Sequence, residues 1–332
     1  MAEEVWTRLA PLIGHTPILE ITYRYRGQKY RTFAKAEYYN LTGSIKDRVA
    51  YYILKKAQET GTLQPGDVIA EATSGNTGIA FSAIGRYLGH KVCIYMPDWM
   101  SRERISLMQA FGAEVILVSR EQGGFLGSIE LCEELARGGG VFLPRQFSNE
   151  DNIDAHIALT GEEIVQQLAR LHVKPDGLVA GVGTGGTIMG LARRLRKENA
   201  KLAAHPLEPL NSPTLSTGYK VGKHRIQGIS DEFIPSILKL SELDSVVSVD
   251  DEDAIIMARM LSEQFGIGVG ISSGANLVGC IMKQAEAGGG DFVTTFADDN
   301  KKYLSTDYSE PYDPARGTVT RELELLSVSA YR

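Results

Sequence analysis

Short apolar runs alternate with segments of helical periodicity from residue 44 onward in this 332-residue chain. Apolar positions three to four apart predict helices, and the short apolar runs between them predict strands. We expect helices at 44–60, 76–88, 101–111, 126–137, 186–198, 250–265 and 275–285, and one more helix that ends at about residue 171. We expect strands at 67–71, 91–96, 114–118, 177–181, 203–207, 246–249 and 291–296. Because strands alternate with helices, parallel sheets covered on both faces are expected, which is an α/β fold.

A polar stretch near residues 148–155 interrupts this alternation. Since a chain of this length can bury two cores, we expect two domains, each with a twisted, mostly parallel sheet flanked by helices. The predicted small mobile domain covers 40–150, and the predicted large domain consists of 1–39 and 151–332. The segment from Tyr303 departs from the pattern, and we expect it to wrap the surface or to lie at an interface.

Charge and composition narrow the classes of partner. The net charge is −6 without a dense Lys/Arg block, which argues against nucleic acid or an anionic membrane surface as a partner. The N-terminus lacks the basic and apolar regions of a signal peptide, so we expect a cytoplasmic protein. Cysteines 93, 132 and 280 stand far apart, and the six histidines, His156 among them, lack ligand spacing. No metal site is predicted.

Three glycine-rich turns could carry chemistry. The turn over 183–187 opens a predicted helix, where backbone N–H groups, threonine hydroxyls and the helix dipole favour an anion. It matches neither a P-loop nor a dinucleotide fingerprint, so a compact phosphate-bearing cofactor fits better than a nucleotide. The turn over 73–77, with the Asn76 amide, suits a substrate carboxylate. The third turn covers 270–274. Any one of these turns taken alone is more often structural than functional.

Lys46 lies in the run Gly-Ser-Ile-Lys-Asp-Arg, one turn into a predicted helix capped by Ser44. On its local sequence alone this lysine would be a solvated surface residue.

Several spaced segments together make the chain resemble the cysteine synthase (O-acetylserine sulfhydrylase) and cystathionine β-synthase family. These enzymes use pyridoxal 5′-phosphate (PLP) and have the tryptophan-synthase-β-like fold, PLP fold type II. The matching segments are Ile13–Pro17, Thr42–Arg48, Thr73–Gly78, Gln146–Phe147, Gly183–Thr187, Ile226–Ile229, Gly270–Ala275 and Lys302–Thr306.

The resemblance implies a role for each motif. Lys46 would form the Schiff base with the cofactor, Asn76 would bond its 3′-oxygen, and Ser272 would face its pyridine nitrogen. The phosphate would be bound by Gly183, Thr184, Gly185, Gly186 and Thr187. The substrate would be bound by residues on a loop of the small domain and beside that loop: Thr73, Ser74, Gly75, Thr77, Gln146 and Gly228.

The reaction class follows from these placements. Lys46 would serve both as anchor and as the base that removes the Cα proton. A neutral Ser272 hydroxyl cannot hold the ring nitrogen protonated, so the ring is a weaker electron sink. This favours β-elimination to an aminoacrylate followed by addition of a nucleophile. The resemblance thus implies cysteine synthesis from O-acetylserine and sulfide.

One loop departs from the family. Cysteine synthases carry a run of small residues where this chain has Gly228-Ile229-Ser230-Asp231-Glu232-Phe233. Carboxylates there would repel sulfide but could deprotonate water. We hypothesise that Asp231 or Glu232 directs the chemistry toward a neutral nucleophile, so that cysteine and water give serine and hydrogen sulfide. In the alternative, both acids face solvent.

Other functions stay open. Serine and homocysteine are a third substrate pair within the family, and a catalytically silent amino-acid or partner-binding sensor is an alternative of another class. The resemblance implies a homodimer. It also implies a possible complex with the tail of serine acetyltransferase, although the altered loop at 230–232 argues against that partner.

Overall fold

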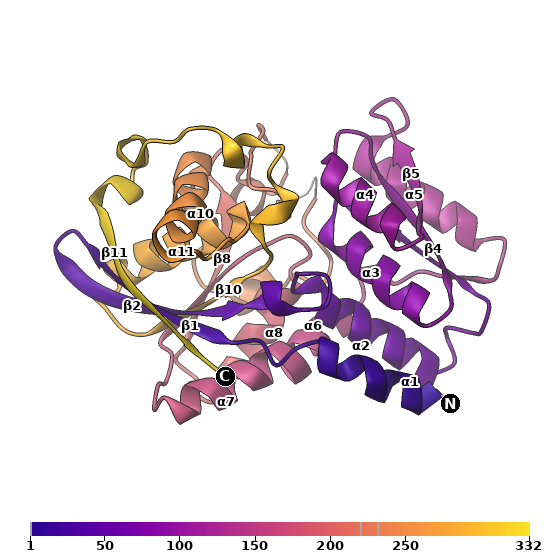
Figure 1. Cartoon of the computed structure of the whole chain (residues 1–332), viewed down its shortest axis with the longest axis horizontal. Helices are drawn as coiled ribbons and strands as arrows, with labels where there is room; N and C mark the ends of the chain where they lie inside the picture. The colour runs from indigo at the N-terminus through magenta and orange to yellow at the C-terminus, as the bar shows by residue number, and fades with distance from the viewer. Residues whose placement is uncertain (1, 220, 231–232) are drawn as a thin grey trace.

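Two β-sheets flanked by helices form the frame of the protein (Figure 1). The computed structural model describes residues 2–219, 221–230 and 233–332. The predicted α/β class is confirmed. Among the described residues, none of the helices combines the length and the apolarity that a membrane span requires.

The smaller sheet has the strand order β5-β4-β3-β6 and is entirely parallel. Successive strand residues point to opposite faces: Ile69 joins the core under α2 and α3, whereas Ala70 and Cys93 join the core under α5. Its elements are α2 (Lys46–Glu59), β3 (Val68–Ala72), α3 (Asn76–Tyr87), β4 (Lys91–Pro97), α4 (Arg102–Ala110), β5 (Glu114–Val118), α5 (Gly124–Ala136) and β6 (Val141–Phe142). All lie inside the segment predicted as the small domain.

The larger sheet has the strand order β11-β1-β2-β10-β7-β8-β9. Helices α7 and α8 lie on one side of it, and α10 and α11 on the other (Figure 1). Its strands are β1 (Ile18–Tyr25), β2 (Gln28–Ala36), β7 (Gly177–Gly181), β8 (Ala203–Pro209), β9 (Val247–Val249), β10 (Phe292–Phe296) and β11 (Leu323–Tyr331). Its helices include α6 (Asp151–Ala155), the π-helical η3 (His156–Gly161), α7 (Glu162–Arg170), α8 (Gly186–Leu195), α10 (Asp251–Phe265) and α11 (Ile271–Glu286).

The antiparallel edge of the larger sheet was not predicted. Strands β1 and β2 form a hairpin through Arg26 and Gly27, both with left-handed backbone as tight hairpin turns require. The segment from Tyr303 crosses α10 and then adds β11 to this edge (Figure 1). Asp253 of α10 holds the segment because it accepts backbone hydrogen bonds from Thr318 (3.0 Å) and Thr320 (2.9 Å).

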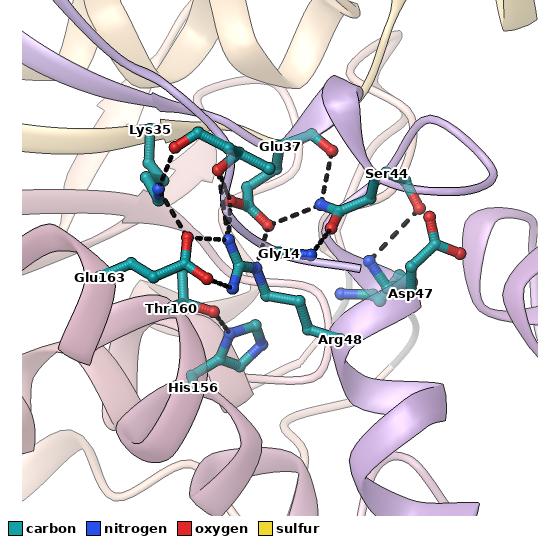
Figure 2. Close-up of polar contacts among 12 residues, drawn as sticks. Gly14, Lys35, Glu37, Ser44, Asp47, Arg48, His156, Thr160 and Glu163 are labelled. Carbon is teal, nitrogen blue, oxygen red and sulfur yellow. Dashed lines mark hydrogen bonds and ion pairs between the residues drawn. The ribbon is translucent and has the colours of Figure 1, made fainter. Parts of the chain in front are cut away.

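A buried ion cluster ties α2 to the larger sheet (Figure 2). The Arg48 guanidinium donates to both oxygens of Glu37 (2.6 and 2.8 Å) and to both oxygens of Glu163 on α7 (2.7 and 2.8 Å). Lys35 of β2 also pairs with Glu163 at 2.8 Å. Burial alone would raise the pKa of Glu163, but the two cations outweigh burial and hold that pKa at about 2.

This cluster predicts a pH-dependent effect of Glu163→Gln. Because the pKa is depressed in the fold, the stabilisation is present above the unfolded value of about 4.5 and is lost as pH falls toward about 2. At about pH 7 the variant should lose on the order of 3 kcal/mol of unfolding free energy. Urea unfolding at several pH values would measure this difference, which should shrink in acid. The matched control is Glu324→Gln, whose carboxylate is 59% exposed; an equal loss there would contradict the assignment.

Candidate active site

A cavity of about 740 Å³ opens where the carboxyl ends of strands from both sheets face each other. Ligands in open parallel sheets bind at such ends. Every predicted site residue that the structure describes, apart from Gly186, lines this cavity: Lys46, Thr73, Ser74, Gly75, Asn76, Thr77, Gln146, Gly183, Thr184, Gly185, Thr187, Gly228 and Ser272. Asp231 and Glu232 lie outside the described residues.

Lys46 is the first residue of α2, rather than one turn inside it as the sequence suggested. The backbone N–H of Lys46 donates to the Ser44 hydroxyl at 3.3 Å, and the N–H of Ile45 donates to the Ala297 carbonyl at 2.8 Å. Asp47 is buried and accepts from the backbone N–H and the hydroxyl of Thr42. Burial raises the pKa of Asp47 to about 6. Lys46 is therefore half-buried at the N-terminus of α2, and the residue before it is hydrogen-bonded to the segment after β10.

The loop over 183–187 forms a cup at the N-terminus of α8. Gly185 has a φ of +88°, a conformation that favours glycine. A Cβ on Gly186 would lie 2.1 Å from the Asn152 amide oxygen, so the loop packs tightly on α6. Asn152 also donates to the Thr184 hydroxyl oxygen at 2.9 Å. The N–H groups in the first turn of α8 and the dipole of that helix favour an anion in this cup.

The loop over 73–77 forms a second cup, at the N-terminus of α3. No side chain caps this helix, so its first N–H groups are available to a ligand. The hydroxyl of Thr77 donates to the Gln146 amide oxygen at 2.6 Å, and the Gln146 amide nitrogen donates to the Ala72 carbonyl at 3.0 Å. These bonds fix the orientation of Gln146 beside the cup.

Asn76 has one amide end paired and the other unpaired. Its amide nitrogen donates to Asp298 at 2.7 Å, and Tyr303 donates to the same carboxylate oxygen at 2.7 Å. The Asn76 amide oxygen is buried without a protein partner. A buried polar atom of this kind is costly unless a ligand satisfies it, so the amide is suited to contact a polar group in the cavity.

Ser272 lies in the first turn of α11 and is 6% exposed. The 270–274 turn runs directly into this helix, and an isolated bridge pairs the preceding Val269 with Asp299. None of the described residues that line the cavity is an aspartate or a glutamate. A ring nitrogen at Ser272 would therefore meet a hydroxyl rather than a carboxylate.

Arg104 of α4 lines the cavity and was missed by the sequence analysis. It is 2% exposed, bonds Ser101 and Gln227, and lies over the Tyr303 ring at 4.9 Å. Its signal in the sequence is one arginine on a predicted helix, which looks the same as a solvated arginine.

An aromatic cluster forms one wall near the cavity. The rings of Phe125 and Phe147 lie 5.5 Å apart, and those of Phe147 and Phe233 lie 5.1 Å apart. Phe125 belongs to α5 beside the smaller sheet, whereas Phe233 follows the altered loop. The cluster thus joins the two halves of the molecule at the site.

Comparison with known proteins agrees with this geometry. Residues 9–298 match the family model described as pyridoxal-phosphate dependent enzyme. The cysteine synthase of Staphylococcus aureus (strain N315) is 38% identical over 307 residues, which cover 92% of this chain and 98% of that protein.

Two solved structures are similar over nearly the whole chain. A hydrogen sulfide-producing enzyme from Fusobacterium nucleatum is 54% identical, with 99% of each chain covered and a TM-score of 0.96. A variant of that enzyme, in which an aspartate is changed to asparagine, was solved with an α-aminoacrylate intermediate. It is also 54% identical, covers 98% of this chain and 99% of its own, and has a TM-score of 0.95.

The residues of the cavity fit PLP, the cofactor of this family. A primary amine, an anion cup, an amide and a hydroxyl come from residues that line one cavity: Lys46, the 183–187 loop, Asn76 and Ser272. The predicted cofactor is confirmed by the family match, whereas the roles of the individual residues stay predictions.

Glu71 carries a testable consequence of this architecture. It is a buried carboxyl in β3 whose oxygens accept from the backbone N–H groups of Ala72 (3.2 Å) and Gln146 (3.4 Å). Burial raises its pKa to about 8. Since the folded pKa lies above the unfolded value of about 4.5, the stabilisation is complete below that value and is lost as pH rises toward about 8.

Glu71→Gln cannot ionise and should remove this loss. Between about pH 5 and pH 8 the parent should lose on the order of 3 kcal/mol more unfolding free energy than the variant. Urea unfolding at both pH values gives the comparison. Glu59→Gln, at a carboxylate that is 61% exposed, is the control, and parallel pH curves for parent and Glu71→Gln would contradict the raised pKa.

Proposed function

Because this chain belongs to the family of pyridoxal-phosphate-dependent enzymes, we propose that it converts L-cysteine and water into serine and hydrogen sulfide. The carbon–sulfur bond at Cβ breaks, sulfide leaves, and water supplies the new hydroxyl. The observation that carries this proposal is the 54% identity over 99% of the chain to a hydrogen sulfide-producing enzyme. The sequence alone had ranked this reaction second.

Cysteine synthesis is the second candidate. The S. aureus relative that carries this name is 38% identical over nearly its whole length, so the scaffold is compatible with both reactions. What favours the first candidate within this chain is the run Ser230-Asp231-Glu232, where cysteine synthases have small residues.

The chain's residues divide the work of binding. When bound, PLP withdraws electrons from the α-carbon of the amino acid attached to it. The 183–187 loop would hold its phosphate, Asn76 would contact its 3′-oxygen, and Ser272 would face its ring nitrogen. The 73–77 loop and Gln146 would hold the substrate carboxylate, which would lie near the available N–H groups at the α3 N-terminus.

Lys46 would act as the base. Its amine, half-buried at the cavity, would take the proton from the substrate α-carbon and return a proton later in turnover. Lys46 and both anion cups line the same cavity, so a substrate whose carboxylate is bound by the 73–77 loop would present its α-carbon to this lysine. One lysine can then serve both as anchor and as base.

The residues on either side of positions 231 and 232 support a role for these two acids. Ser230 lines the cavity with a left-handed backbone (φ 57°), and its hydroxyl donates to the Ser212 carbonyl at 3.0 Å. Phe233 packs on Phe147 in the aromatic cluster. A non-glycine residue with positive φ is strained by about 1 kcal/mol or more and persists only where its surroundings demand it. Both neighbours of the pair are thus held beside the cavity.

A substrate panel tests the proposed reaction. Purified protein given cysteine alone should release sulfide and serine in equal amounts, with oxygen from isotopically labelled water found in the serine. O-acetylserine with sulfide, and serine with homocysteine, are the competing arms. Faster turnover of either pair would replace the proposal by that activity, and binding of cysteine without any product would favour the sensor.

Asp231→Asn and Glu232→Gln test the activation of water. If one acid deprotonates the water, its variant should form serine about 100-fold more slowly, while the first equivalent of sulfide per active site is still released as a burst. Lys46→Ala, which should abolish both sulfide and serine, is the control. Unchanged serine formation in both acid variants would refute the role of this loop.

Three further expectations belong to this proposal. The family resemblance supports a homodimer and a cytoplasmic location, and light scattering would test the dimer. The boundaries 40–150 for a small mobile domain, and 1–39 with 151–332 for the large domain, stay predictions: the strands within 18–36 belong to the larger sheet, whereas Trp6 and Leu9 pack in the core under α2 and α3.

A further inference from the structure

His156 lies buried directly behind the cup at 183–187. It is 0% exposed and is the first residue of the π-helical segment η3. A Cβ on Gly190 of α8 would lie 2.5 Å from the Cβ of His156, so the backbone of α8 packs directly against the histidine. π-Helical turns are rare and recur at functional sites.

Both ring nitrogens of His156 meet threonine hydroxyls. Nδ1 lies 2.9 Å from Oγ1 of Thr160, within the same π-helical segment (Figure 2). Nε2 lies 3.3 Å from Oγ1 of Thr187, which lines the cavity. The imidazole therefore links a fully buried hydroxyl to one that belongs to the cup.

We propose that His156 is a positioning residue for phosphate binding: it carries its ring hydrogen on Nε2 and donates it to Thr187, which leaves the Thr187 hydroxyl free to donate to the phosphate. The chain of donors then runs from Thr160 to His156, from His156 to Thr187, and from Thr187 to the ligand. This inference rests on the assignment of the cup to the cofactor phosphate under the proposed function, and not on the identity of the substrate.

The direction of the donors follows from hydrogen-bonding capacity. Each threonine hydroxyl has one hydrogen, and phosphate oxygens only accept. If Thr187 donated to Nε2, it would present only lone pairs to the phosphate, and the two oxygens would repel. With the hydrogen on Nε2, the hydroxyl accepts from the ring and donates forward, and Thr160 donates to Nδ1. Only this order satisfies every group.

The surroundings keep the ring neutral. Burial, and then the Lys46 and Arg48 cations, hold the pKa of His156 well below its ordinary value of 6.5. A neutral imidazole has one N–H and one acceptor nitrogen, which is the arrangement that the donor chain needs. The two distances establish the contacts of Nδ1 and Nε2. Because the ring is neutral, it has a single N–H hydrogen, which is on one of these two nitrogens.

Two substitutions separate the two ring nitrogens. His156→Gln keeps a side-chain N–H near the position of Nε2, and His156→Asn keeps one near the position of Nδ1. We expect His156→Gln to retain cofactor affinity and His156→Asn to bind PLP on the order of 10-fold more weakly, because a hydrogen bond to a charged group is lost. Thr187→Val should weaken binding at least as much, and adding His156→Asn to it should weaken binding little further.

The readout is cofactor binding to the protein freed of PLP, followed by absorbance, with PLP and with pyridoxal, which lacks the phosphate, as matched probes. The loss should appear for PLP and be absent for pyridoxal. The ³¹P shift of bound PLP should also change in His156→Asn and stay near that of the parent in His156→Gln.

Three outcomes would overturn the proposal: equal losses for both probes, equal losses in both histidine variants, or a lowered melting temperature of the cofactor-free protein that accounts for the weaker binding. If both histidine variants fail to fold, Thr160→Val against Thr160→Ser decides. The valine should weaken PLP binding and the serine should restore it, and no difference between them would also refute the inference. Failure to bind PLP at all would refute the site itself, whereas PLP binding without sulfide release would refute only the proposed reaction.

Discussion

The site depends on the buried Arg48 guanidinium, which lies two residues after Lys46 and is held by two carboxylates. Removing a partner from a buried cation is costly, and here the partners come from outside α2: Glu37 follows β2, and Glu163 is the second residue of α7. The first turn of α2 is thereby fixed to the larger sheet, although the rest of that helix packs on the smaller one. The position of Lys46 follows from the position of Arg48.

The segment before α7 also contacts the cup at 183–187. Glu163 stands at the start of α7, and the π-helical segment that ends just before it carries His156, which contacts Thr187 of the cup. Polar contacts and helix backbone thus connect Arg48, two residues after Lys46, through Glu163 to His156 (Figure 2), which contacts Thr187 of the cup. A rigid cofactor held at both ends, as proposed above, would require such a fixed spacing, because a small displacement of either end would cost binding or rate.

The parallel core could be read from the sequence because its strands are short apolar runs between amphipathic helices; β4 and β5, for example, begin where they were expected. Strand β11 was not predicted, since it pairs with β1 across about three hundred residues and this pairing is a tertiary property. Lys46 was recognised through its motif and not through its local pattern. Arg104 and His156 were missed as site residues because their burial is a tertiary property. His156 is buried, and its ring nitrogens are satisfied by two threonine hydroxyls.

The charge of the cavity bears on the choice of nucleophile. Its described lining includes Lys46, Arg104, Arg120 and Lys223 and no carboxylate, although the chain as a whole is acidic. Such a lining attracts anions, which suits the phosphate, the substrate carboxylate and sulfide alike. A positively charged lining would help a cysteine synthase, because it attracts the anionic sulfide that this reaction uses as its nucleophile. Carboxylates introduced beside such a cavity would weaken that attraction locally and supply a base, so acids at 231 and 232 would favour water over sulfide in the second half of the reaction.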